Sequence, residues 1–273
     1  MSDFHIRVWG VRGSTPAAGK DTIRYGGETT CFEVEAGGSY VIVDCGSGAR
    51  KLGDAVIQRP CRHIDMMFTH THLDHICGLP FFKPAYDPRF QIDAWSGQFK
   101  DPDGLRDAIC RIMSPPVFPV TANRLKAIQF KQFSAGDEIV KKGGLTIKTI
   151  ALNHPDGACG YRFEYDGHAT CIITDHEMGH KNYDDAIEAF IEGADVVFYD
   201  GMYTNAEYRH FIGYGHSSWE HVIETCTRAN VKVPVIFHHD PCRSDDELDA
   251  ILKQAKARHH NAEVAYEGMT FSF

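Results

Sequence analysis

Long apolar runs are missing from this 273-residue sequence. No stretch approaches the ~20 consecutive apolar residues that a membrane-spanning helix needs. The first five residues, Met1-Ser2-Asp3-Phe4-His5, also lack the basic and apolar segments of a secretion signal. We therefore expect a soluble, cytoplasmic protein with no membrane partner.

Paired cysteines are missing as well. The nine cysteines are scattered, odd in number and never form a Cys-x-x-Cys motif. This pattern indicates neither a disulfide framework nor a thiolate zinc site. We expect most of them to be small core residues in a reducing compartment.

Positive charge is scarce, since the formal net charge is −9 and the pI is near 5.9. An extended nucleic-acid surface needs many Lys and Arg side chains, so this balance favours a small-molecule substrate. Isolated arginines near a site would still hold one phosphate, although each is by default a surface charge. The candidates are Arg12, Arg24, Arg50 and Arg162.

Internal repeats and low-complexity segments are absent, so we expect one domain over residues 1–273. Eleven strand-like runs, several joined by glycine turns, predict two mixed sheets with helices outside, an α/β fold. The predicted strands are 6–8, 31–35, 40–44, 64–68, 92–95, 127–133, 145–151, 161–165, 169–174, 196–199 and 233–237. The predicted helices are 105–112, 183–191, 217–229 and 244–257, the last two opening with capping boxes at Ser217 and Ser244.

Residues 97–134 fit this pattern badly. The segment Met113–Val120 contains three prolines and is unsuited to the interior of a sheet. We expect an insertion at about 97–134 that serves either as a lid over the site or as a packed surface connection.

The sequence is rich in metal ligands in the run Thr69-His70-Thr71-His72-Leu73-Asp74-His75. It follows an apolar strand, and the i, i+2 spacing of His70 and His72 places both imidazoles on one side of an extended segment. The chain then turns into a helix, which directs Asp74 and His75 to a second position. The run therefore predicts two metal ions.

Two ions need more ligands, and three candidates follow predicted strands later in the chain. They are His154, Asp175 and His238. A carboxylate can bridge two ions through its two oxygens, which suits Asp175.

The order of these motifs resembles the metallo-β-lactamase superfamily, and specifically its ribonuclease Z-like phosphodiesterase branch. The N-terminal Val8–Pro16 and the Val43–Gly48 element are also similar to that branch. The resemblance implies a four-layer αββα sandwich. It implies His70, His72, His154 and Asp175 on one ion, and Asp74, His75, Asp175 and His238 on the other, with His239 as an alternative to His238.

The segment Gly213–Ser218 is similar to the Gly-His-Ser motif of the same branch, and Asp200 occupies the place of its acidic partner. The resemblance implies that His216 and Asp200 are catalytic, together with the ligand Asp74. Simpler interpretations are that Asp200 caps a turn and that His216 merely precedes a helix. Five other histidines have no motif partner and are expected at the margin of the site or on exposed faces: His176, His180, His221, His259 and His260.

The function expected from the resemblance is a dinuclear phosphodiesterase. A metal-bridging hydroxide would attack phosphorus, and His216, oriented by Asp200, would protonate the leaving oxygen. We expect a small phosphodiester substrate, most simply a 3′,5′-cyclic nucleotide such as cyclic AMP or cyclic GMP. A ribonuclease Z-like RNA phosphodiesterase and a carboxylic hydrolase, either lactonase or thioesterase, are the alternatives. Zinc is the expected metal, with manganese or iron as alternatives, and a homodimer is a reasonable expectation.

Overall fold

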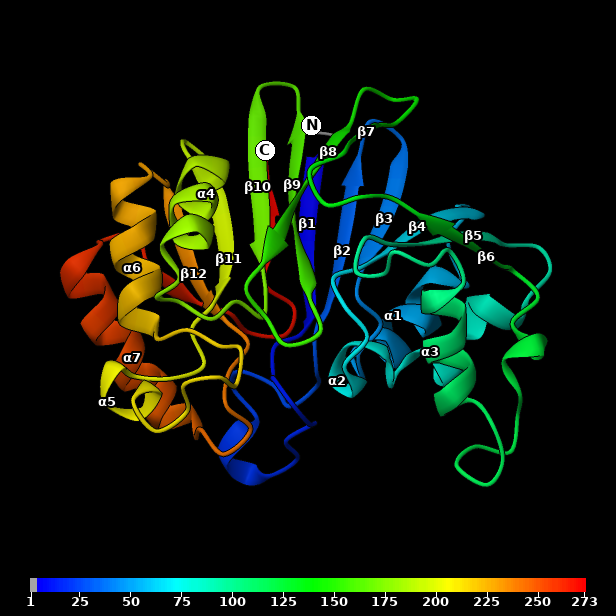
Figure 1. Cartoon of the computed structure of the whole chain (residues 1–273), viewed down its shortest axis with the longest axis horizontal. Helices are drawn as coiled ribbons and strands as arrows, with labels where there is room; N and C mark the ends of the chain where they lie inside the picture. Colours follow the sequence, from blue (N-terminus) through cyan, green and yellow to red (C-terminus); the bar gives the residue numbers. More distant parts are fainter. Residues whose placement is uncertain (1–3) are drawn as a thin grey trace.

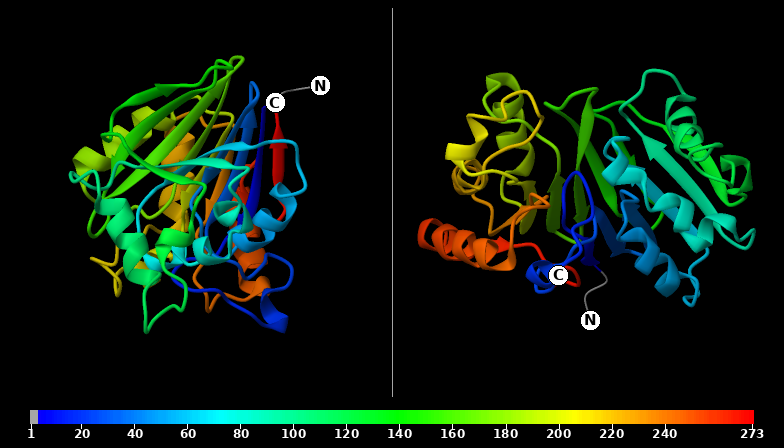
Figure 2. Two further views of the ribbon diagram at one scale, coloured as in Figure 1. Left: turned by 90° about the vertical axis from the view of Figure 1, so that its right-hand side faces the viewer. Right: turned by 90° about the horizontal axis from the view of Figure 1, so that it is seen from below.

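The computed structural model describes residues 4–273, in which two β-sheets pack face to face and helices cover their outer faces (Figure 1 and Figure 2). This is the predicted four-layer αββα sandwich, so the fold prediction is confirmed. Among the helices of residues 4–273, none has the length and apolar character to cross a bilayer.

The first sheet has seven strands in the order β14-β1-β2-β3-β4-β5-β6. Strands β14 to β3 pair antiparallel, and β3 to β6 pair parallel. In β1 the buried and more exposed side chains alternate, as expected for a strand with one face in the core. The strands are β1 (Phe4–Gly10), β2 (Cys31–Ala36), β3 (Ser39–Val43), β4 (His63–Phe68), β5 (Gln91–Ser96), β6 (Ile128–Gln132) and β14 (Thr270–Ser272).

The second sheet also has seven strands, in the order β13-β12-β11-β10-β9-β8-β7. Strands β13 to β10 pair parallel and β10 to β7 pair antiparallel. Every residue of β11 is buried, because parallel strands are covered on both faces. The strands are β7 (Glu138–Val140), β8 (Thr146–Leu152), β9 (Ala158–Tyr165), β10 (His168–Ile173), β11 (Val196–Asp200), β12 (Val233–Phe237) and β13 (Glu263–Val264).

All eleven predicted strands are present, and three short strands were missed. Strands β7, β13 and β14 have only two or three residues each, too few to show a period of two. The predicted glycine turns join β2 to β3 and β9 to β10. Gly37 and Gly38 have φ of 55° and 77°, the left-handed conformation that such hairpin turns need.

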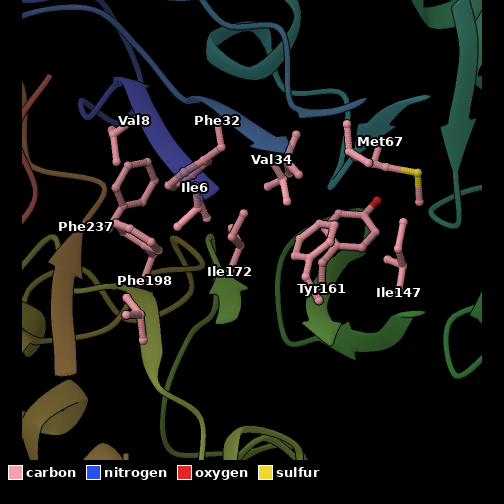
Figure 3. Close-up of a cluster of buried hydrophobic side chains, with 14 of the residues drawn as sticks. Ile6, Val8, Phe32, Val34, Met67, Ile147, Tyr161, Ile172, Phe198 and Phe237 are labelled. Carbon is pink, nitrogen blue, oxygen red and sulfur yellow. The ribbon is translucent and has the colours of Figure 1, made fainter. Parts of the chain in front are cut away.

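The core between the sheets consists of interdigitating aliphatic and aromatic side chains (Figure 3). The ring of Phe32 lies 5.0 Å from that of Phe198 and 4.7 Å from that of Phe237, so the two sheets contact directly. Each fully buried side chain of this kind stabilises the fold by roughly 1.5–3 kcal/mol. This rigid double sheet is the scaffold for the loops at its edges.

Helices α1, α2 and α3 cover the first sheet, and α4, α6 and α7 cover the second. The predicted helices 105–112, 183–191, 217–229 and 244–257 correspond to α3, α4, α6 and α7. The helices are α1 (Ala49–Val56), α2 (Leu73–Ile76), α3 (Gly104–Ile112), α4 (Lys181–Ile191), α5 (Asn205–Tyr208), α6 (Trp219–Arg228) and α7 (Asp245–Arg258).

The two predicted capping boxes had different outcomes. At α7 the box is confirmed, since Ser244 accepts a hydrogen bond from the Glu247 N–H and Glu247 accepts one from the Ser244 N–H. At α6 the prediction was wrong, because Ser218 is the N-cap. The hydroxyl of Ser217 is buried and donates to the carbonyl of His176 at 2.5 Å, so it is not available to cap.

The segment 97–134 contributes both α3 and the edge strand β6 to the domain. Leu105 and Ile109 anchor α3 in the outer core of the first sheet. The proline-rich residues 113–120 lie in the connection between α3 and β6, outside both sheets.

Candidate metal centre

Loops at one edge of the sandwich bring the predicted metal ligands together. Strand β4 leads into α2, which lies in the lower half of the molecule in Figure 1. Strands β8, β10 and β12 end at the same place, because their following residues contact those of the β4–α2 segment. Each predicted ligand therefore lies at or just beyond a strand end or in α2.

Three histidines form the first group, His70, His72 and His154, whose ligand atoms lie within 4.8 Å of one another. Nε2 of His154 is 3.0 Å from Nδ1 of His72. The other ring nitrogen of His154, Nδ1, donates to the carbonyl of Gly215 at 2.8 Å, which fixes the orientation of the ring.

The second group consists of Asp74, His75, Asp175 and His238, all buried, with ligand atoms again within 4.8 Å of one another. Oδ2 of Asp74 lies 3.2 Å from Nε2 of His75 and 3.3 Å from Nε2 of His238. The N–H of Ser14 donates to the same Asp74 oxygen at 2.8 Å and holds this carboxylate in place.

Asp175 lies between the two groups and presents one oxygen to each. Its Oδ2 is 3.6 Å from Nε2 of His70 and 3.7 Å from Nε2 of His154. Its Oδ1 is 3.2 Å from Nε2 of His75 and 3.1 Å from Nε2 of His238. This is the arrangement that a bridging carboxylate requires.

The ring orientations in this cluster direct histidine Nε2 atoms at carboxylates. Nδ1–H of His75 donates to Asp44 at 2.8 Å, so Nε2 is the ring atom directed at Asp74 and Asp175 and would be the atom that binds a cation. Among residues 4–273, the Nε2 atoms of His70, His75 and His238 are buried without a hydrogen-bond partner. A bound cation would give these Nε2 atoms a partner and would offset the charge of the neighbouring carboxylates. The donor set therefore fits divalent metal ions.

Comparison with known proteins agrees with this geometry. The family model of the beta-lactamase superfamily domain matches residues 39–239, which is 201 of the 273 residues. The chain belongs to this superfamily. Ribonuclease Z of Haloarcula marismortui is 25% identical over 168 residues, which cover 60% of this chain and 48% of that protein. The chain thus matches about half of that relative's length.

Solved structures show the same superfamily fold. The metallo-β-lactamase fold protein YhfI from Bacillus subtilis superimposes with a TM-score of 0.75 and 16% identity, covering 98% of this chain and 99% of that one. A diphosphatase of the PhnP family gives a TM-score of 0.71 and 15% identity, covering 99% of this chain and 97% of that one. At these identities the likeness concerns the fold.

Asp44 contacts the cluster although it was not predicted from the sequence as a site residue. Its buried carboxylate accepts hydrogen bonds from Nδ1 of His75 at 2.8 Å and from the Thr69 N–H and hydroxyl at 2.8 and 2.7 Å. It fixes the ring of His75 with Nε2 towards the cluster. Asp44 follows strand β3 directly, so the rule that identified His238 after β12 would also have found it.

Burial and mutual charge set the protonation of the cluster when no cation is present. Burial raises the pKa of a carboxyl, but nearby histidines outweigh it and hold the pKa values of Asp74 and Asp175 below their usual range. Burial lowers the pKa of His75, yet the carboxylates of Asp175, Asp74 and Asp44 reverse this and raise it. Burial leaves the pKa of His70 well below its ordinary value. Carboxylates that stay ionised and an imidazole that stays neutral are suitable metal ligands.

His216 and Asp200 form a hydrogen-bonded pair at the edge of the cluster. Nδ1 of His216 lies 2.9 Å from Oδ2 of Asp200 and 3.9 Å from Oδ2 of Asp175. Asp200 is fully buried and also accepts from the N–H groups of His176 and Met202 at 3.2 and 3.1 Å. Burial alone would lower the pKa of His216, but the Asp200, Asp175 and Asp74 carboxylates outweigh burial and raise it to about 9.

Two residues that follow Asp175 in the sequence support this pair. His176 was expected at the margin of the site or on an exposed face. It lies at the margin, where its N–H donates to Asp200, and it is fully buried with Nε2 3.1 Å from Asp184. The carboxylate of Glu177 accepts from the N–H groups of Gly213 and Gly215 at 2.7 and 2.8 Å. The two Glu177 contacts hold the loop that carries His216, and they arise only in the folded chain.

The structure also separates His238 from its alternative His239. Nε2 of His239 lies 2.8 Å from the carbonyl of Ala265, away from the other ligands. Burial lowers the pKa of His239 to about 3, so it is neutral. The geometry therefore favours His238 as the ligand.

The arginines considered as phosphate ligands are engaged elsewhere. Arg12 is completely buried, which corrects the expectation of a surface charge, and donates to the carbonyls of Gly26, Asp240 and Arg243. Arg24 pairs with carboxylates of α7. Arg50 lies 3.9 Å from Glu28, and Arg162 donates to carbonyls at the end of α4.

Proposed function

We propose that this chain is a dinuclear metal-dependent phosphodiesterase that hydrolyses a small phosphodiester, a 3′,5′-cyclic nucleotide such as cyclic AMP or cyclic GMP. The observation that carries this proposal is the position of the His216–Asp200 pair beside Asp175. A protonated imidazole next to a bridging carboxylate is placed to protonate an oxygen that leaves a phosphorus bound there.

The donors support two ions in the proposed assignment. One would be held by His70, His72, His154 and Asp175, and the other by Asp74, His75, Asp175 and His238. When bound, such ions lower the pKa of water and neutralise phosphate oxygens. Imidazole and carboxylate donors suit zinc first, with manganese or iron as alternatives.

The side chains then supply positioning and a proton. Asp200 accepts from Nδ1–H of His216 and stabilises the imidazolium, so Nε2–H is available as the acid. In the reaction, the Nε2–H bond of His216 breaks while the leaving alkoxide gains that proton. Asp44 keeps the His75 ring fixed throughout.

The small-substrate part of the proposal is supported by charge. The chain carries a net charge of −9, and the four candidate arginines are paired or buried away from the cluster. A long polyanion would gain little attraction from such a surface.

A second candidate function is ribonuclease Z-like RNA cleavage, which is favoured by the similarity to the Haloarcula marismortui enzyme of that name. The proposed catalytic pair would serve either phosphodiester. The substrate distinguishes the two functions.

The test is a substrate panel with metal-loaded protein. It comprises cyclic AMP, cyclic GMP, bis-p-nitrophenyl phosphate, a tRNA precursor with a 3′ trailer, a lactone and a thioester, with metal content measured by elemental analysis. We expect the cyclic nucleotides to be cleaved fastest. Preferred cleavage of the precursor supports the second candidate, and cleavage of only the lactone or thioester with two metals bound refutes both phosphodiesterase proposals.

The matched variants are His216→Ala and His180→Ala, the latter removing an exposed histidine. Loss of the general acid typically lowers the turnover rate of a diester with a poor leaving group about 10²–10⁴-fold. His216→Ala should show this loss with unchanged metal content, and His180→Ala should show none. Full activity of His216→Ala would remove the imidazole from the mechanism.

A further inference from the structure

A cavity of about 640 Å³ lies beside the metal centre, and the proposed mechanism does not use it. His72 belongs to both places: its Nδ1 faces His154 in the cluster, while 40% of its side chain is exposed and it lines the cavity. A substrate with its phosphate at the metal centre can therefore extend past His72 into this space.

One wall of the cavity is a face of helix α3. Leu105 and Ile109 pack into the core, which directs Gly104, Ala108 and Arg111 to the cavity. Because Gly104 and Ala108 have little or no side chain, the helix leaves room for a ligand. This assigns to the segment 97–134 the role of a wall of the site.

The aromatic ring of Phe99 forms part of the same wall and is held in position. A Cβ atom at Gly104 would lie only 2.4 Å from the Phe99 ring, so the ring covers the first turn of α3. The Gln132 side-chain amide donates to the Phe99 carbonyl at 2.8 Å and fixes the backbone. Together with Ile76 and Ala108, which also line the cavity, this ring offers an apolar surface for a flat group.

Polar groups at the same cavity favour a hydrogen-bonding ligand without a second phosphate. The Gln98 amide is oriented by the Thr71 hydroxyl, which donates to its oxygen at 3.0 Å. Two carboxylates, Asp107 and Asp156, line the cavity with only one guanidinium, Arg111. These carboxylates repel an additional phosphate and accept hydrogen bonds from N–H and O–H groups.

We propose that this cavity binds the nucleobase of the substrate, with the base stacked on Phe99 and its polar edge towards Gln98 and Asp107. The proposal rests on the proposed phosphodiesterase function and names the specificity element of that site. The volume lies within the range of small-molecule sites, roughly 300–1,000 Å³. The excess of carboxylates also selects a mononucleotide, because the next phosphate of an RNA chain would meet Asp107 or Asp156.

The experiment compares a substrate that reaches the cavity with one that does not. Steady-state kinetics are measured with cyclic AMP and with methyl p-nitrophenyl phosphate for the wild type, Ala108→Phe and Phe99→Ala. Arg106→Phe is the matched control, since it adds the same side chain at an exposed position of the same helix. Thermal unfolding verifies that each variant is folded, and saturation-transfer NMR with adenosine reports binding without turnover.

Filling or removing part of a base pocket typically costs about tenfold or more in affinity. We expect Ala108→Phe and Phe99→Ala to raise the KM for cyclic AMP about tenfold and to change the KM for methyl p-nitrophenyl phosphate by less than about twofold. Both variants should also abolish the NMR signal of bound adenosine. Arg106→Phe should match the wild type. If cyclic AMP is cleaved and folded variants leave its KM unchanged, the subsite is refuted and the function stands. If no phosphodiester is cleaved but adenosine binds and Ala108→Phe abolishes binding, the function is refuted and the subsite stands.

Discussion

The substitution Asp44→Asn tests whether a residue that binds no metal controls the proposed metal centre. Asn keeps the size of Asp and tolerates the left-handed backbone found here, where φ is 58°. What it loses is the ability to accept hydrogen bonds with both side-chain atoms. The three donors that now surround Asp44, two from Thr69 and one from His75, cannot all be satisfied.

The magnitude of the effect follows from the tautomer of His75. If the Asn amide faces His75 with its NH₂ group, Nδ1 must accept and the ring proton moves to Nε2. That proton then points at Asp74 and Asp175, which lie 3.2 Å away, and blocks the ligand position. Removing an outer partner of this type lowers metal affinity about 10- to 100-fold, equivalent to about 1.4–2.7 kcal/mol.

The assay is a competition titration of metal-free protein with zinc and a chromophoric chelator. We expect weaker binding at one of two sites, with the other changed less. Asp195→Asn is the control, because Asp195 is a buried acid directly before β11, where it accepts from the Ala169 N–H at 2.8 Å. Equal affinity of wild type and Asp44→Asn at both sites would refute the reasoning.

Four further outcomes follow from the structure. Asp200→Asn removes a carboxylate that raises the pKa of His216 to about 9, so the alkaline limb of the kcat–pH profile should move to lower pH; an unmoved limb contradicts the assignment. Glu177→Gln should lower kcat about tenfold with unchanged metal content, since two N–H groups of the His216 loop lose their carboxylate. Ser218→Ala should cost about 1 kcal/mol of unfolding free energy in urea, as a lost N-cap of α6. Chelation should lower the Tm, because an ion that binds only the folded chain stabilises it and its removal leaves the buried Nε2 atoms of the cluster without a partner; an unchanged Tm would mean that no ion stabilises the fold.

The limits of sequence reasoning are clear at individual residues. His154, Asp175 and His238 could be predicted because each follows a recognisable apolar strand and has a side chain that can bind a metal ion. The contact between Asp44 and His75 spans 31 positions and exists only after β3 and β4 pair. Ser217 and Ser218 are adjacent and chemically alike, so only burial of the first shows which one caps α6.

Three of the strand ends around the centre, those of β3, β10 and β12, share one backbone feature. Asp44, Asp175 and His238 have φ of 58°, 55° and 58°, a left-handed conformation that costs a residue with a side chain roughly 1–2 kcal/mol. Such strain persists only where the surrounding structure enforces it, and it concentrates at functional sites. Glycine at these positions would relieve the strain but would remove a carboxylate or an imidazole from the cluster. The fold therefore accepts the same unfavourable backbone free energy at the ends of three separate strands. In each case the strained conformation directs a side chain towards the same centre.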